Sequence, residues 1–200
     1  MKKLLYIITF LFFYQLTYCQ VNDSLVKRKL VDLVMRAVKA ENDSLYEQTI
    51  ILIDSAIAID STDYDSYVIK AEALWLLKRY RESADVYDKS IKVRNPDYLA
   101  DAYVHLGMLY EKANMPQKAK GEYLRAIDLY DRKIFVPNFM YLQKINYAVV
   151  LLLSGNEERW KQEFKNLLKE YSYIDEVKAL EGKNRSEVLE IHFSYNGGYR

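Results

Sequence analysis

The residues best suited to chemistry are few and far apart in this sequence. His105 and His192 are its only histidines, and Cys19 is its only cysteine. The chain contains no His-Glu-x-x-His zinc motif, no glycine-rich phosphate loop, no nucleophile elbow and no dinucleotide fingerprint. We therefore expect no catalytic residue, no metal site, no cofactor and no small-molecule substrate. The sequence predicts that the protein is not an enzyme.

An acidic run at residues 60–65 is the nearest approach to a metal site. It reads Asp-Ser-Thr-Asp-Tyr-Asp, which could be mistaken for a calcium loop. A calcium loop also needs a turn glycine at its sixth position and a bidentate glutamate at its twelfth, where this chain has Asp65 and Ala71. These side chains are better explained as caps of helix ends between two consecutive helices.

The amino-acid composition limits which fold classes and which kinds of partner are compatible with the sequence. The chain has 200 residues, of which 50% are hydrophobic and 28% charged, which is enough for a sizeable core and excludes a disordered chain. Gly (6) and Pro (3) are scarce, so the balance favours helices over a strand-and-turn fold. Lys and Arg (29) nearly equal Asp and Glu (28), and this net charge of +1 argues against nucleic-acid binding.

The first nineteen residues have the layout of a secretory signal peptide. Lys2 and Lys3 precede an unbroken apolar run over residues 4–13, which is about half the length that a membrane-spanning helix needs. Thr17 and Cys19 supply small residues for signal peptidase, so cleavage would leave Gln20 as the first residue. We expect an exported protein, periplasmic or secreted. The alternative is lipidation at Cys19, which would anchor the protein to a membrane, although Tyr18 is larger than such a signal prefers.

A repeated helical pattern follows. Within residues 102–129 the large positions are Tyr103, Leu106 and Tyr110, and small residues stand where two helices would cross, at Gly107, Ala119 and Ala126. This pattern resembles the tetratricopeptide (TPR) repeat, a helix–turn–helix unit of about 34 residues. The resemblance implies an all-α fold, a right-handed superhelical stack in which each repeat contributes a first helix, A, and a second helix, B.

The same frame recurs along the chain. The position of Ala126 is taken by Ala56, Ser90 and Leu167, and that of Gly107 by Ala37, Ala71 and Ala148. We predict an N-terminal lead-in over 20–29 and about four repeats, at 30–63, 64–97, 100–133 and 141–174. An insertion at 131–143 separates the last two. Residues 175–200 would form a C-terminal capping segment, and its stretch 186–195 suits a helix, with a strand as the alternative.

In TPR proteins, positions 2, 5, 6, 9, 12 and 13 of the A helices line a concave inner face where peptides usually bind. The resemblance places mainly apolar residues there, with a few acids. The predicted peptide-binding groove comprises Val34, Val38, Val68, Glu72, Trp75, Val104, His105, Met108, Glu111, Ile145 and Val149. The lysines and asparagines of a carboxylate clamp are not at these positions, so we do not expect a C-terminal carboxylate as ligand.

These observations favour a scaffold or adaptor that binds a protein or peptide segment in its concave groove. Trp75 would be the anchor, and Glu72 and Glu111 would pair with basic groups. The alternative is a structural or oligomeric subunit of a cell-envelope assembly that contacts partners through the 131–143 insertion or the C-terminal end. The A helix of the fourth repeat is apolar on every side from Ala148 to Leu153, so we expect the C-terminal segment to cover it.

Overall fold

The computed structural model describes residues 32–33, 36, 42–132 and 140–192. These residues form nine α-helices and one 3-10 helix, and no strand occurs among them. The chain divides into two compact units, and the boundary falls between Val93 and Arg94. The predicted all-α architecture of helix hairpins is confirmed.

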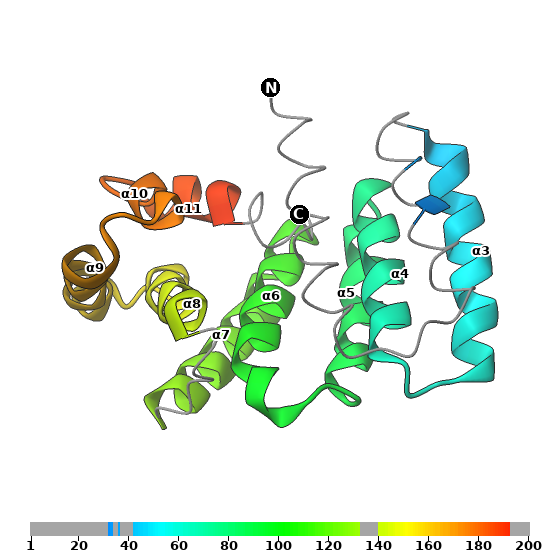
Figure 1. The fold of residues 1–200 in the computed structure, drawn as a ribbon, viewed down its shortest axis with the longest axis horizontal. Coiled ribbons are helices and arrows are strands. Elements are labelled where there is room, and N and C mark those ends of the chain that lie inside the picture. The colour runs from blue at the N-terminus through cyan, green and yellow to red at the C-terminus, as the bar shows by residue number, and fades with distance from the viewer. Residues whose placement is uncertain (1–31, 34–35, 37–41, 133–139, 193–200) are drawn as a thin grey trace. The chain divides into compact units, whose positions relative to one another are not determined.

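The first unit contains α3 (Asp43–Ile59), α4 (Tyr64–Leu76) and α5 (Tyr80–Ile91). Helix α4 packs against both α3 and α5, and the antiparallel α4–α5 hairpin corresponds to the second predicted repeat (Figure 1). Helix α3 occupies the B-helix place of the first repeat. The predicted A helix of the first repeat lies largely outside the described residues. Of the three residues described there, Leu33 is buried and Asp32 pairs with Arg36.

The second hairpin closes through small residues at the predicted positions. Helix α5 buries Ser83, Ala84, Tyr87 and Ile91, whose spacing of three or four places them on one side of the helix. The Ser83 hydroxyl donates a hydrogen bond of 2.6 Å to the carbonyl oxygen of Ala71 in α4. This buried bond joins the A and B helices directly at two residues with small side chains.

The cap of α3 differs from the simplest expectation. Ser44 and Glu47 have the spacing of a capping box, which would begin a helix at residue 45. Instead Asn42 is the N-cap, and its side-chain oxygen accepts hydrogen bonds from the backbone of Ser44 (3.0 Å) and Leu45 (3.3 Å). Glu47 is thereby free of a capping role and pairs with Arg79 at the start of α5.

The second unit contains the remaining helices. After the 3-10 turn η1 (Pro96–Tyr98) come α6 (Leu99–Lys112) and α7 (Pro116–Asp131), then α8 (Met140–Leu153) and α9 (Glu157–Tyr171). Two short helices follow, α10 (Asp175–Ala179) and α11 (Arg185–His192). The hairpins α6–α7 and α8–α9 match the third and fourth predicted repeats. Helix α8 also packs against α7, α6 and α11.

The three A-to-B turns share one backbone conformation. Lys78 (φ 60°), Asn114 (φ 58°) and Gly155 (φ 87°) are all left-handed, and each ends its A helix. The next residue donates a backbone hydrogen bond of 2.8 Å to a carbonyl five residues earlier, as from Arg79 to Leu74. This is the Schellman motif, in which a left-handed residue lets the last carbonyls of a helix be satisfied.

Helix α8 is buried on all sides, as its sequence predicts. No residue from Ala148 to Leu153 exposes more than 5% of its surface. The covering elements within this unit are α6, α7, α9 and α11. The segment that could be helix or strand is helical as far as His192. Asn184 and Glu187 form a true capping box there, with reciprocal 3.0 Å hydrogen bonds to each other's backbone.

Several of the predicted segments lie partly or wholly outside the described residues. The signal peptide (1–19), the lead-in (20–29) and the middle of the insertion (133–139) lie outside it. The ends of the insertion are helical, because Asp131 is the last residue of α7 and residues 140–143 belong to α8. Asn156 begins α9 as expected, but its side chain makes no capping hydrogen bond.

Candidate functional site

One side of α4 presents Val68, Glu72 and Trp75 together. Their spacing of four and three residues aligns them along one side of the helix. Val68 and Trp75 are partly exposed, whereas Glu72 exposes only 3% of its surface. These three residues, which we call the α4 site, are the predicted groove residues of the second repeat. They place a carboxyl group between two apolar side chains.

Glu72 is electrostatically unusual. No other described residue gives it a hydrogen bond or an ion pair, and burial alone raises the pKa of its carboxyl group well above the ordinary value. A buried charge without a partner is unfavourable, and such groups cluster at functional sites. Glu72 is therefore a buried carboxyl group that has no charge partner among the described residues.

The hairpin holds the α4 site in a fixed position. The Trp75 ring packs against Tyr80 at the start of α5, with ring centroids 6.5 Å apart. Arg79, in the turn between them, bonds Glu82 (2.6 Å) and Glu47 of α3 (3.1 Å). Lys70 pairs with Asp54 of α3. Both sides of α4 are thus tied to its neighbours, which limits the movement of its inner face.

The predicted groove residues of the third and fourth repeats are mostly buried. Glu111 keeps a partly exposed side chain, but the other five expose 6% of their surface or less. These five are Val104, His105, Met108, Ile145 and Val149. Val34 and Val38 of the first repeat lie outside the described residues. The groove prediction thus finds accessible side chains at Val68, Trp75 and Glu111.

A polar cluster that sequence reasoning did not find joins the third and fourth repeats. The Asp101 carboxylate of α6 accepts hydrogen bonds from Tyr130 of α7 (2.6 Å), and from Gln143 (3.2 Å) and Asn146 (2.7 Å) of α8. Burial, with Asp101 beside it, raises the pKa of the Tyr130 hydroxyl well above its usual value. The three donors lie 29 to 45 residues from Asp101 in the sequence, so only the fold brings them to it. They hold three helices in register.

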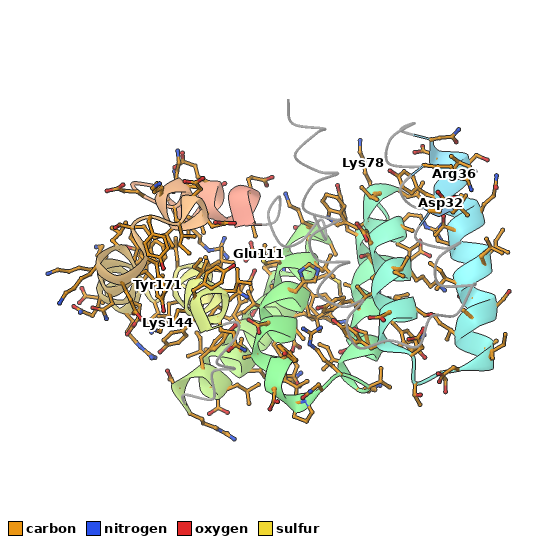
Figure 2. The ribbon with its side chains drawn as sticks, in the orientation of Figure 1. Asp32, Arg36, Lys78, Glu111, Lys144 and Tyr171 are labelled. Carbon is orange, nitrogen blue, oxygen red and sulfur yellow. The ribbon has the colours of Figure 1, made fainter. Side chains whose placement is uncertain are left out.

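The outer side of the fourth repeat carries two further polar contacts. Lys144 of α8 donates hydrogen bonds to Glu170 (2.7 Å) and Tyr171 (3.4 Å) of α9, and Figure 2 shows the Lys144 and Tyr171 side chains close together between these helices. Asp131, at the end of α7, accepts hydrogen bonds from Tyr147 of α8 and Arg159 of α9.

Asp131 and Tyr147 titrate away from their usual values because of these bonds. The hydrogen bond from Arg159 lowers the pKa of Asp131, and the one from Tyr147 lowers it further. Burial, together with the bond to Asp131, raises the pKa of Tyr147 to about 12. Both shifts favour the hydrogen-bonded forms at neutral pH, so this cluster is structural.

A pocket of about 350 Å³ lies where the third and fourth repeats meet α11. Its lining combines an acid and a base, Glu111 and Arg185, which are paired with each other. Gln117 and Lys120 of α7, and Ser154 and Gly155 after α8, form other parts of it. At the base of the pocket the Tyr123 ring packs against Gly107, and burial raises the pKa of its hydroxyl.

Within the described ranges no three His, Cys, Asp or Glu side chains converge to hold a metal ion. Asp60 instead accepts a hydrogen bond from the backbone of Thr62 (2.9 Å), and Asp63 accepts one from Ser66 (2.6 Å), as expected for turn and helix-start residues. In the same part of the chain, no helix has both the length and the apolar character to cross a membrane.

One comparison, with a family model, agrees with the repeat pattern. A family model described as "Tetratricopeptide repeat" matches residues 64–97 and 100–132. A search of curated proteins finds no match. Among solved structures, the chain is similar to one described as "Crystal structure of YrrB: a TPR protein with an unusual peptide-binding site". The two are 15% identical, the similarity covers 88% of this chain and 92% of that one, and the TM-score is 0.47.

The two matched segments coincide with the α4–α5 and α6–α7 hairpins, which have the small-residue contacts and the left-handed turns described above. Their bounds also lie within one residue of the second and third repeats predicted from the sequence pattern. Residues 64–97 and 100–132 of this chain therefore each match the tetratricopeptide-repeat model and fold as one helix hairpin.

Proposed function

We propose that this protein is an exported, non-enzymatic adaptor that binds a peptide segment on the α4 site. The observation that carries the proposal is the Glu72 carboxyl group, buried between Val68 and Trp75 with no partner among the described residues. The peptide would pack apolar side chains on the partly exposed Val68 and Trp75, and its lysine or arginine would reach Glu72, which is 3% exposed in the free protein, by displacing one of those two side chains. Export rests on the basic start and apolar run of residues 1–19.

The chemistry of such a complex follows from the site. A cationic side chain would supply the charge partner that Glu72 lacks, and a charge-assisted hydrogen bond is about twice as strong as a neutral one. Trp75 would bury apolar surface against the peptide, and tryptophan is among the residues most often found at binding hot spots. The surrounding ion pairs of Arg79 and Lys70 hold the hairpin in place, which reduces the entropy lost on binding.

Selection from a display library of random peptides on the full-length protein tests this proposal. Enriched peptides should carry a basic residue between apolar ones, and Glu72→Gln and Trp75→Ala should each weaken their binding about tenfold or more. Leu124→Ala is the matched control, because Leu124 is an exposed apolar residue (54%) on α7. Peptides that bind the Glu72→Gln protein as tightly as the wild type would contradict the proposed site.

Stability measurements separate a binding role for Glu72 from a structural one. Because burial raises the pKa of this carboxyl group, folding is penalised at pH values above the unfolded pKa of about 4.3, and the penalty grows as pH rises toward the folded pKa. Glu72→Gln should therefore stabilise the protein at pH 7 while weakening peptide binding, and its stability gain should shrink toward pH 4. A variant that loses stability and binding together would indicate a structural role.

Mass spectrometry of the native protein tests export, since the mature chain should begin at Gln20.

A further inference from the structure

Three tyrosine side chains form a row where α8 begins and α9 ends. The ring centroids of Tyr141, in α8, and Tyr171, the last residue of α9, lie 6.4 Å apart, and those of Tyr171 and Tyr173 lie 6.5 Å apart. Neighbouring rings are tilted by 45° and 54°. We call these residues the tyrosine row. Tyr141 is the first position of its predicted repeat, so the row lies outside the inner positions predicted for the groove.

The tyrosine row is accessible to solvent. Tyr173 exposes 72% of its surface, and Tyr141 and Tyr171 are half-buried. Tyrosines at the packing positions of the repeat behave differently, because Tyr87 and Tyr123 expose only 2% and 1%. Core packing therefore does not account for the row as it accounts for those residues.

The row already holds one cation, which comes from the chain itself. The Lys144 ammonium group lies 5.2 Å from the centre of the Tyr171 ring and donates a hydrogen bond of 2.7 Å to the Glu170 carboxylate. The negatively polarised face of an aromatic ring attracts a cation at this distance. Figure 2 shows Lys144 and Tyr171 together between α8 and α9. The fold thus combines a cation, an aromatic face and a carboxylate at the centre of the row.

A carboxylate without a partner lies at one end of the row. Burial raises the pKa of the Tyr141 hydroxyl, and the nearby charge of Glu176 in α10 raises it further. Glu176 is half-buried, and no described residue gives it a hydrogen bond or an ion pair. The preceding residue, Asp175, is paired with Lys178 at 3.0 Å. A cation from outside the chain would supply the partner that Glu176 lacks.

The spacing of the rings matches that of an extended peptide. Such a peptide advances about 3.3 Å per residue, so side chains on one side follow one another at about 6.6 Å. Alternate residues could therefore meet successive rings. Arginine suits the two outer rings, because its planar guanidinium group stacks on aromatic faces and pairs with carboxylates. An apolar residue suits Tyr171, where Lys144 already supplies a positive charge.

We propose that the tyrosine row binds an extended segment of a partner protein with the pattern Arg-x-apolar-x-Arg. One arginine lies on Tyr141 and pairs with Glu176, the apolar residue contacts Tyr171, and the other arginine stacks on Tyr173. This surface lies wholly within the second unit, and it does not depend on the α4 site.

Two peptides of identical composition test the proposal on the full-length protein. Acetyl-Arg-Gly-Leu-Gly-Arg-amide presents its three large side chains on one side when extended, whereas acetyl-Arg-Gly-Leu-Arg-Gly-amide turns the last arginine to the opposite side. NMR titration follows the ring signals of carbon-13-labelled tyrosines, which single Tyr→Phe variants assign. The first peptide should shift the Tyr173 signal and bind about threefold more tightly or better. Equal affinities, or no saturable shift of Tyr173, overturn the proposal.

Substitutions of Tyr173 separate stacking on the ring from simple apolar contact. Tyr173→Phe keeps the aromatic face and should keep the affinity for the first peptide within about twofold. Tyr173→Leu keeps apolar surface without that face and should weaken binding about threefold or more. Both variants should fold as the wild type does, since Tyr173 is mostly exposed. Undiminished binding to the leucine variant overturns the proposal.

Charge variants test the role of the unpaired carboxylate. Glu176→Gln should weaken the first peptide about threefold or more. Asp175→Asn is the matched control, because it removes an equal charge from the next residue, and its affinity should stay near that of the wild type. Equal weakening by both variants would show that only the net charge matters, and it overturns the proposal. Glu72→Gln should leave binding unchanged, whereas a loss would assign the peptide to the α4 site and overturn the tyrosine row.

Discussion

Close approach of two residues fixes the geometry of the third repeat. A Cβ atom added to Gly107 would lie 2.4 Å from the Tyr123 ring, closer than atoms can pack, and Tyr123 itself is only 1% exposed. Because Gly107 has no side chain, the Tyr123 ring of α7 can pack directly against this position of α6. Gly121 in the same repeat has no atom within 4 Å of the corresponding place.

These two glycines give a matched prediction. Gly107→Ala should destabilise the protein by about 1–3 kcal/mol, because the Tyr123 ring must move within a packed core. Gly121→Ala, in the exposed middle of α7, should stabilise it by about 0.5–1 kcal/mol through helix propensity. Urea denaturation followed by circular dichroism measures both. A neutral or stabilising Gly107→Ala would show that the two helices can separate without loss.

Unlike Gly107, which allows close packing, the buried carboxyl group of Glu72 is unfavourable for folding. Its pattern position on α4 was predictable from the repeat frame, but its burial was not. Burial depends on neighbours that are distant in sequence, and the periodicity of one helix shows only which residues share a side. The same reason explains why Val104 and Met108 are more deeply buried than an open groove requires.

At the scale of elements, the turn between A and B helices is the most regular feature. A left-handed residue occupies the same place in three successive repeats, yet only Gly155 has the residue type that suits it best. A side chain with a Cβ atom in this conformation costs about 1–2 kcal/mol relative to the right-handed region, and asparagine tolerates it better than lysine does.

Lys78→Gly should therefore stabilise the protein by about 0.5–1 kcal/mol, and Asn114→Gly by less. Lys92→Gly is the control, because Lys92 also follows a helix but has an ordinary φ of −68°. The melting temperature, measured by calorimetry, should rise for Lys78→Gly and stay equal or fall for Lys92→Gly. A loss of stability in Lys78→Gly would mean that the lysine side chain contributes more than its backbone strain costs.

Much of the element-level fold follows directly from the sequence, and the exceptions have physical causes. The small residues Ala71, Gly107 and Ala148 are local signals, and the hairpins form where they predict. The first cap was mistaken because Asn42 and Ser44 are both good N-cap residues two positions apart. The Asp101 cluster was missed because its members belong to three different helices.

The pH dependence of the stability of the whole molecule arises from carboxylates that are hydrogen-bonded in the folded state. Hydrogen bonds from basic partners lower the pKa of three of them: Glu82 through Arg79, Asp131 through Arg159, and Glu170 through Lys144. A carboxyl group whose pKa is lower in the folded than in the unfolded state contributes stability above its unfolded pKa, about 4. That contribution is lost as pH falls through the folded pKa.

We therefore expect the unfolding free energy to decrease steadily between about pH 5 and pH 2. Asp131→Asn should lower stability at pH 7 by about 0.5–1 kcal/mol, a figure reduced for solvent screening, and should flatten the acid decrease. Asp128→Asn removes an equal charge from the same helix, but Asp128 pairs only with Arg132 one turn away. Its acid profile should follow the wild type. Identical profiles for all three proteins would exclude Asp131 as a source of the pH dependence.

The uniform turns within repeats contrast with the connections between them. In the three hairpins that the structure describes, the A helix passes to its B helix through three residues, such as Ala113, Asn114 and Met115, whereas the links between repeats differ in length and conformation. Engineered loops, fluorophores or epitope tags should thus be accommodated after α5 or α9 and rejected after α4 or α8. Natural variation in chain length among such proteins would be expected to collect at the same permissive joints.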